Sequence, residues 1–468
     1  MKSKVTLLWL FVCLALVIPA GGKKQSVRQA NAGWEQVPEI LKRIVPPEFP
    51  DKNFNITDYG AVGNGKTDCT EAFKKAISAA HEAGGGRVVV PAGTFFSGPI
   101  HLKSNVNLHV SAGAVIKFST KPKKYLPAVY TRWEGVECMN YSPLVYAYEQ
   151  ENIAITGEGT LDGQASYENW WRWKRTQGPD RKKLFEQGAT GVPVKKRLFG
   201  GGKLRPTMIE PYKCKNILIE GVKIKNGPFW HIHPVLSQNI TVRNVTVTGP
   251  GPNNDGCNPE SCKDVLIKGC FFDTGDDCIA IKAGRNNDAR RVNVPSENII
   301  VQDCQMKDGH GGVVIGSEMT GGVRNVFVEN CTMDSPNLDR AIRLKTNSVR
   351  GGFIENIYVR NITVGRVKEA VLKIDFFYSD IEKGNYRPRV RNVNLENVTS
   401  KKSEHALWLR GFEDAPITDV RLKNCTLNNN RNPNIISNVK NLVLENVKIN
   451  GKLVKTDTKK LTPAGSSR

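Results

Sequence analysis

Beyond residue 22 the sequence lacks any apolar run long enough to cross a membrane. The early run from Val5 to Ile18 has only 14 residues, whereas a spanning helix needs roughly 20. It follows Lys2 and Lys4 and precedes small residues, an order typical of a cleaved leader rather than an anchor. We therefore predict a signal peptide at residues 1–22, export to the periplasm or the extracellular space, and no membrane span.

Acidic residues are scarce, because 45 Asp and Glu stand against 67 Lys and Arg, which gives a formal charge of +22. A chain this basic favours a polyanionic partner, which could be nucleic acid, an acidic lipid surface or an acidic polysaccharide. Since we expect export, the predicted partner is the polysaccharide and not nucleic acid. The alternative is a basic surface that serves only solubility.

Histidine is also scarce, and none accompanies the cysteines Cys257, Cys262 and Cys278. This argues against a metal cluster there, and we predict neither a metal nor another cofactor. Ten cysteines follow the predicted leader, an even number that could indicate disulfides in an exported protein. The repeat described next gives a different explanation.

From residue 152 onward a short phrase occurs ten times, at intervals of 22 to 36 residues from its second copy on. After a leading Asn or Asp, the first and third positions are Ile, Val or Leu, and the fifth is Gly, Asn or Asp. The alternation indicates a strand with one buried face, and the fifth residue types tolerate left-handed backbone at a corner. The leading residues are Asn152, Asn216, Asn239, Asp264, Asn298, Asn325, Asn356, Asn392, Asp419 and Asn441.

One such strand cannot bury its apolar face alone, but stacked strands bury it against the coils above and below. The sequence therefore predicts an all-β, single-domain, right-handed parallel β-helix over residues 51–455. We expect an extended lead-in at residues 23–50 and a polar tail at 456–468, with fraying from Lys452. A helix predicted for Asp68–Ala83 would cap the N-terminal end of the stack.

The same register explains four of the cysteines. They occupy the sixth position of the phrase, where other copies have Val or Ile. A cysteine that is interchangeable with valine is a small core residue rather than half of a disulfide. The four are Cys270, Cys304, Cys331 and Cys425.

A long insertion, roughly Ala165–Arg205, interrupts the early coils, and from residue 172 its cations outnumber its acids by eleven to two. It could be a solvated loop, or a wall or lid beside a groove for an acidic sugar. The second hypothesis predicts a higher KM when Lys195, Lys196 and Arg197 are replaced by alanine.

Four polar clusters are spaced by 21, 34 and 33 residues, close to one repeat each. Because neighbouring coils lie about 4.8 Å apart, we expect these clusters to stack on one surface. Two nearby carboxylates cannot both ionise freely, so one becomes an acid and the other a base, as glycosidic cleavage requires. The clusters contain Asp255, then Asp276 with Asp277, then His310, and then Arg343 with Lys345.

Each cluster alone has an ordinary explanation as turn aspartates, a surface histidine or a surface cation pair. Asp276 and Asp277 are adjacent and would face opposite sides of a regular strand. Both reach one groove only if Gly275 opens a bend. The shared registry of the four clusters favours function, with Arg343 and Lys345 on one face to bind a carboxylate.

Here the chain resembles the polygalacturonases, glycoside hydrolase family 28. The resemblance covers most of residues 54–375, and members more often have Thr in place of Asn254. It is carried chiefly by four motifs: Asn253-Asn254-Asp255, Gly275-Asp276-Asp277, Gly309-His310-Gly311 and Arg343-Leu344-Lys345.

The resemblance implies an inverting hydrolase without a metal. By it, Asp276 is the general acid, and Asp255 and Asp277 hold the attacking water. His310 would support the acid, and the pair on the last motif would bind a substrate carboxylate.

The segment Pro228–Pro234 resembles the exo-acting, bacterial branch of the family, and with the insertion it predicts cleavage from a chain end. We add His233 and Lys282 to the predicted substrate-binding residues. His231 and His233 could instead be packing residues.

The leading hypothesis is an exported, monomeric hydrolase of α-1,4-linked galacturonate in pectin. The alternatives are a hydrolase of a substituted pectin (rhamnogalacturonan or xylogalacturonan), a pectate lyase on the same fold, and a β-helix that only binds acidic glycans. A lyase needs Ca²⁺ or a basic group and yields an ultraviolet-absorbing product, which a hydrolase does not.

Overall fold

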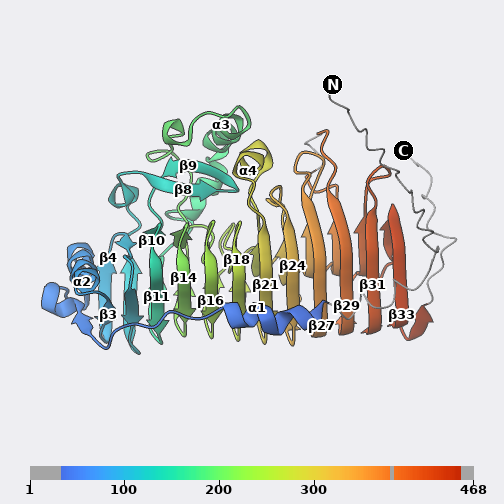
Figure 1. Cartoon of the computed structure of the whole chain (residues 1–468), viewed down its shortest axis with the longest axis horizontal. Coiled ribbons are helices and arrows are strands. Elements are labelled where there is room, and N and C mark those ends of the chain that lie inside the picture. The colour runs from blue at the N-terminus through green and yellow to red at the C-terminus, as the bar shows by residue number, and fades with distance from the viewer. Residues whose placement is uncertain (1–32, 380–383, 455–468) are drawn as a thin grey trace, which may run out of the picture.

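The computed structural model describes residues 33–379 and 384–454 as one elongated stack of coils (Figure 1). The predicted signal peptide at residues 1–22 and the predicted tail at 456–468 lie outside the described residues. Within the described ranges, no helix is both long enough and apolar enough to cross a bilayer.

The stack is a right-handed parallel β-helix, as predicted, and each coil adds strands to a large 23-stranded sheet. Its strands are β1 (Asn53–Asn55), β2 (Asn64–Asp68), β3 (Gly86–Val90), β4 (Gly93–Ser97), β6 (Val106–Val110), β7 (Ala114–Phe118), β11 (Glu151–Gly157), β12 (Thr160–Asp162), β14 (Lys215–Glu220), β15 (Lys223–Lys225), β16 (Gln238–Arg243), β17 (Thr246–Gly249), β18 (Lys263–Lys268), β19 (Phe271–Thr274), β21 (Ser296–Gln302), β22 (Gln305–Met306), β24 (Val323–Glu329), β25 (Thr332–Met333), β27 (Phe353–Arg366), β29 (Arg389–Lys402), β31 (Ile417–Leu427), β33 (Val439–Ile449) and β34 (Lys452–Val454).

A second face of the coils carries two shorter parallel sheets, and a separate antiparallel hairpin stands outside the stack. The second face consists of β5 (Ile100–His101), β10 (Val145–Tyr148), β13 (Ile209–Tyr212), β20 (Ile279–Ile281), β23 (Val313–Ile315), β26 (Arg340–Lys345), β28 (Ala370–Asp375), β30 (His405–Arg410) and β32 (Ile435–Ser437). The hairpin consists of β8 (Val129–Trp133) and β9 (Val136–Asn140).

Helical segments are short and lie outside the coils. They are η1 (Trp34–Gln36), α1 (Val37–Arg43), η2 (Ile56–Tyr59), α2 (Thr70–Glu82), η3 (Pro122–Tyr125), η4 (Trp171–Arg175), α3 (Gly178–Ala189), η5 (Val194–Lys196) and α4 (Asn286–Val292).

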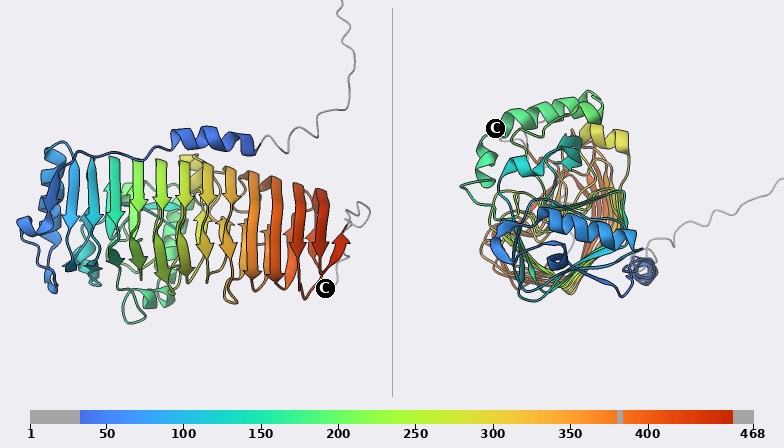
Figure 2. Two further views of the ribbon diagram at one scale, coloured as in Figure 1. Left: turned by 90° about the horizontal axis from the view of Figure 1, so that it is seen from below. Right: turned by 90° about the vertical axis from the view of Figure 1, so that its left-hand side faces the viewer.

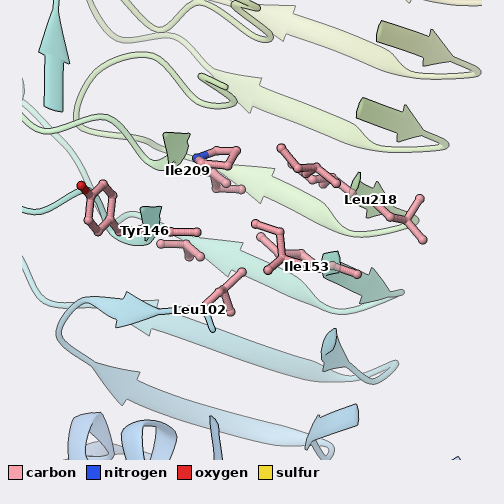
Figure 3. Close-up of a pocket in the computed structure, with 12 residues that line it drawn as sticks. Leu102, Tyr146, Ile153, Ile209 and Leu218 are labelled. Carbon is pink, nitrogen blue, oxygen red and sulfur yellow. The ribbon is translucent and has the colours of Figure 1, made fainter. Parts of the chain in front are cut away.

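Equivalent positions of the repeat stack directly on one another in the core. Ile217 pairs in register with Ile240, which pairs with Val265 on the next coil, and all three are buried. Each such side chain contributes roughly 1.5–3 kcal/mol by leaving water. Figure 3 shows side chains between earlier coils, including Leu102 and Ile153, around a small and almost wholly apolar pocket of the interior.

The leading asparagines form a ladder of side-chain hydrogen bonds along the stack. Asn239 donates its amide to Asn216 at 2.7 Å, and Asn216 donates to Asn152 at 2.8 Å. All three have left-handed backbone, with φ of 54–57°. The sequence pattern predicted left-handed backbone only at the fifth position of the phrase. Gly221 and the residues at the fifth position of the other copies also have positive φ.

All ten described cysteines are free and buried. Cys270, Cys304, Cys331 and Cys425 lie in the core at the positions that valine occupies in other coils, for example Val245. The interpretation of these four as small core residues is confirmed.

The predicted capping helix is confirmed as α2, which begins two residues after Asp68. Asp68 accepts a hydrogen bond from the backbone of Thr70 at 3.0 Å. Phe73 and Ile77 are buried against the first coils, so the helix closes that end of the stack.

The expectation of an extended lead-in at residues 23–50 is wrong for its helical part, η1 and α1. This part lies on the outer surface of the large sheet (Figure 2). The Trp34 ring lies 5.5 Å from the Phe327 ring, and Val37 and Ile40 pack in the same cluster. Apolar side chains on the outer face of the strands thus provide a surface on which the helical segment packs. The polar composition of residues 23–50 did not indicate this packing.

The expectation of fraying from Lys452 is also wrong for its first three residues. Lys452 to Val454 form β34, which pairs antiparallel with the end of β33, Val454 opposite Val447.

Candidate active site

The four predicted clusters meet at the corner where the large sheet turns into the second face. The first three clusters each follow a strand of the large sheet, one coil further along the stack each time, and the fourth lies on a strand of the second face. Asp255 lies in the loop after β17, Asp276 and Asp277 follow β19, His310 lies between β22 and β23, and Arg343 and Lys345 are on β26.

Gly275 opens the bend that the sequence required. Its N–H donates to the Gly249 carbonyl at 2.7 Å, and a Cβ at this position would meet the Gly251 carbonyl oxygen at 2.3 Å. The chain leaves the strand here, so Asp276 and Asp277 both line one cleft.

The three carboxylates form a compact cluster. One oxygen from each of Asp255, Asp276 and Asp277 lies within 4.8 Å of the others. Asp255 and Asp277 are buried, whereas the Asp276 side chain is 17% exposed and hydrogen-bonds through Oδ1 to His310 Nδ1 at 3.0 Å. The His310 side chain is 53% exposed.

The environments push the pKa values of two of these carboxyls apart. Burial, and next the charge of Asp276, raise the pKa of Asp255 to about 8. Burial also acts to raise the pKa of Asp276, but the hydrogen bond and charge of His310 outweigh it and hold this pKa below its usual range. The same hydrogen bond raises the pKa of His310. At neutral pH these shifts favour the protonated form of Asp255, and they favour an ion pair between a protonated His310 and an ionised Asp276.

Two cations on β26 and one directly after β20 neutralise the cluster. Lys345 Nζ donates to Asp277 Oδ2 at 2.6 Å, and Arg343 Nη1 lies 3.7 Å from Asp277 Oδ1. Lys282 Nζ lies 3.7 Å from Asp255 Oδ2, and also lies 4.5 Å from the centre of the Trp230 ring. The structure thus places Lys282, Arg343 and Lys345 beside the carboxylates, and their role in binding substrate stays a prediction.

The carboxylates open into a cleft of about 320 Å³. Its floor consists of the three carboxylates with Lys282 and Lys345, whereas Arg343 does not line the cleft. Its rim comes from irregular segments for which the repeat gave no signal. The rim residues that the sequence analysis did not identify are Glu134 in the hairpin turn, Lys174 and Arg181 in the insertion, Arg285 before α4, Ser317, Glu318 and Arg350 in loops of the second face, and Tyr378 and Ser379 after β28.

The profile of a known family, described as "Glycosyl hydrolases family 28", matches residues 82–449 of this chain. The chain belongs to this family. It is therefore a glycoside hydrolase, and a column of carboxylates in a cleft is the arrangement that such chemistry needs.

Three relatives illustrate the family relationship. A probable polygalacturonase of Vitis vinifera is 29% identical over 392 residues, which cover 80% of this chain and 74% of the relative. An exo-poly-alpha-D-galacturonosidase of Dickeya chrysanthemi is 28% identical over 392 residues, covering 75% and 62%. The solved structure of a hyperthermoactive exopolygalacturonase from Thermotoga maritima is 46% identical, with a TM-score of 0.87 and coverage of 90% and 96%.

One side of the hydrolase cleft is a wall made of the β8–β9 hairpin, α3 and α4, which stand together above the middle coils (Figure 1). Buried charges join its parts. Arg197 donates to Asp288 Oδ1 at 2.8 Å and to the Glu137 carbonyl at 2.9 Å, and the Glu137 N–H donates to Asp288 Oδ2 at 2.8 Å.

This wall corrects one prediction about the insertion. Arg197 is 1% exposed and holds the wall together, and Lys195 and Lys196 are exposed but do not line the cleft. The insertion contributes Lys174 and Arg181 instead.

The structure does not bring His233 to the cleft, contrary to its prediction as a substrate-binding residue. It is fully buried, with Nε2 2.7 Å from Glu260 Oε2 and its ring edge-on to Trp230. Because Trp230 covers it, His233 supports the cleft lining from behind. His231 is also a packing residue: its Nδ1 bonds the Asp255 carbonyl at 2.9 Å, and burial lowers its pKa to about 4.

Three clustered carboxylates could in principle hold a divalent cation. Here Lys345 and Lys282 lie 2.6 and 3.7 Å from two of them and already supply two positive charges. A further cation would meet this charge at short range, so the donor set fits a metal poorly.

Proposed function

We propose that the chain is an exported exopolygalacturonase, which hydrolyses α-1,4 galacturonosyl linkages of pectin one residue at a time from a chain end. The observation that carries this proposal is the cleft, where three carboxylates lie among cations that suit a uronate, with a rigid wall at one side. The 46% identical exopolygalacturonase and the exo-acting Dickeya relative support it. Export rests on the leader pattern of residues 1–22.

The residues divide into two groups by what they can do. Asp277, whose negative charge Lys345 stabilises, accepts a proton from the attacking water, and Asp255 orients this water by hydrogen bonding. The pair of Asp276 and His310 supplies the proton to the leaving oxygen. Its single shared proton can pass to the carboxyl as charge develops on the substrate.

We propose further that the anomeric configuration is inverted, as the family resemblance implies. The spacing of the carboxylates taken alone argues against inversion. The nearest oxygens of the cluster lie within 4.8 Å of one another, whereas the two carboxyls of an inverting enzyme are usually about 6.5–9.5 Å apart. The proposal of inversion therefore rests on the family resemblance alone.

Stereochemistry can be read by proton NMR within the first minutes of hydrolysis, before mutarotation. We expect β-galacturonate to appear first from the α-linked polymer. Initial formation of the α-anomer would contradict inversion and indicate a covalent intermediate.

The size of the products over time tests the proposed function itself. On polygalacturonate we expect monomer from the first time point, no intermediate ladder, no new ultraviolet absorbance, and unchanged rates in a chelator. A ladder would indicate endo action, and chelator-sensitive, absorbing products would indicate a pectate lyase. The same assay on xylogalacturonan and rhamnogalacturonan, where we expect little release, tests the substituted-pectin alternatives.

A further inference from the structure

A fully buried arginine, Arg205, lies at the end of the insertion and next to the cleft lining. Its exposed fraction is 0%, and no carboxylate of the described residues forms an ion pair with it. Burial lowers the pKa of Arg205 to about 10, so the guanidinium still carries its charge at neutral pH. Burying an unpaired charge is costly, so hydrogen bonds to other groups must satisfy it.

The two Nη atoms of Arg205 donate to four acceptors on three segments beside the cleft. Nη1 donates to the Pro228 carbonyl at 3.0 Å and to the Pro252 carbonyl at 2.7 Å. Nη2 donates to Asn253 Oδ1 at 2.8 Å and to Gln177 Oε1 at 3.5 Å. The guanidinium therefore ties the insertion to the loop after β17, which carries the first of the four polar clusters.

These contacts fix the direction in which the Asn253 side chain points. Lys174 Nζ also donates to Asn253 Oδ1, at 3.0 Å. Because Arg and Lys side chains can only donate, the amide oxygen must face them and the amide NH₂ must face the other way. On that side Asn253 Nδ2 lies 3.5 Å from Asp276 Oδ2.

Oδ2 is the oxygen of Asp276 that remains for the leaving group. Oδ1 already accepts from His310 Nδ1 and from the Asp277 N–H, both at 3.0 Å. Among the described residues, the Asn253 amide is the one hydrogen-bond donor to Oδ2. A donor here holds the oxygen in place and stabilises the charge that appears when its proton has passed to the leaving oxygen. The distance of 3.5 Å is long, as catalytic hydrogen bonds often are before substrate binds.

We propose that Arg205 is a positioning residue for the acid, and that it acts through Asn253, whose amide it orients toward Asp276 Oδ2. This proposal deepens the proposed function and rests on it, because it takes Asp276 as the acid of a hydrolase. It also makes the insertion part of the catalytic apparatus, since Gln177 bonds the same guanidinium and Lys174 bonds the same amide.

Asn253→Asp tests the amide with almost no change of shape. The new carboxylate would pair with Arg205 and Lys174, but the donor to Asp276 is lost and a negative charge takes its place. Aspartate also tolerates the left-handed backbone at this position, where φ is 58°. We expect kcat on polygalacturonate to fall by about ten- to a hundred-fold, as for one hydrogen bond to a charged group, with KM nearly unchanged.

Arg205→Met and Arg205→Lys separate the charge of the guanidinium from its fork of donors. Methionine removes the charge, whereas lysine keeps it but cannot reach all four acceptors, so we expect kcat to fall by about ten-fold or more in both. In Arg205→Met alone of these two, the alkaline limb of the pH profile of kcat/KM should move up by at least about half a pH unit. Loss of a positive charge raises the pKa at which the Asp276–His310 pair gives up its proton.

Asn253→Asp adds a negative charge beside the same pair and should move the alkaline limb in the same direction. The test therefore stands even if Arg205→Met does not fold. The other ionisable groups near the pair and near Arg205 are the same in all three variants. They are Asp255, Asp277, Asp339, Lys282 and Lys345 around the pair, and Glu134 and Tyr167 beside Arg205.

Lys182→Met is the matched control, because it removes a positive charge from α3 of the same insertion. The Lys182 side chain is 80% exposed and does not line the cleft, so neither kcat nor the alkaline limb should change. If the parent cleaves polygalacturonate and Asn253→Asp keeps its full kcat, the positioning role is wrong. A lower kcat without a shift of the limb would indicate a merely structural contact and would also contradict it. No hydrolysis by the parent would instead overturn the proposed function.

Discussion

Replacing Asp276 by asparagine is expected to lower kcat on polygalacturonate by about 10²–10⁴-fold, the usual contribution of a positioned acid or base. Asparagine keeps the size of the side chain and a hydrogen-bond acceptor for His310, but it cannot carry a proton to the leaving oxygen. KM should change little, because the cations that suit the substrate carboxylate remain in place. The measurement is release of reducing ends over a range of substrate concentrations.

The matched control is Asp419→Asn. Asp419 occupies the leading position of the repeat, where most coils have asparagine, and its oxygen accepts from Asn441 at 2.6 Å. This variant should keep full activity and stability. A loss of kcat that occurs only in Asp276→Asn then comes from the missing proton donor and not from a change in folding. If Asp276→Asn retained full activity, another group would have to be the acid.

Replacing Arg197 by alanine is expected to destabilise the protein by about 3–5 kcal/mol, as is typical when one partner of a buried ion pair is removed. Asp288 would keep its contact with Arg291 at 2.9 Å but lose Arg197 at 2.8 Å. The Glu137 and Val192 carbonyls would also lose their donor. Denaturant unfolding, followed by circular dichroism, measures the change.

Lys195→Ala and Lys196→Ala are the neighbouring controls. Both side chains are exposed, so each variant should stay within about 0.5 kcal/mol of the parent, and KM should not rise. If Arg197→Ala were as stable as these two and raised KM instead, the original hypothesis that this basic run binds substrate would be restored.

The coil architecture could be predicted from the sequence because each strand of the stack solves the same packing problem. Ile217, Ile240 and Val265 recur at one position since each contacts its counterpart on the next coil. The site followed from the same regularity, because clusters one repeat apart must stack.

The parts that the sequence did not reveal lie outside this regularity. The β8–β9 hairpin and the loops that carry Glu318, Arg350 and Tyr378 occur once each, so no period indicates where they fold back. His233 was predicted to bind substrate because it belongs to the segment Pro228–Pro234. In the structure its side chain is buried behind Trp230 and does not face the cleft. Lys282, which lies five residues after Asp277 and directly follows β20, does face the cleft.

The strand β34 runs against the direction of every other strand in the large sheet. At the end of a stack of parallel coils, unpaired backbone N–H and C=O groups could pair with a strand of a second molecule. Such pairing, repeated from copy to copy, would produce fibres. The reversed strand covers part of that last edge, as α2 covers the first, so both growth points of the rod are blunted. A repeat that could continue indefinitely therefore has a partly covered edge at each end of the described stack.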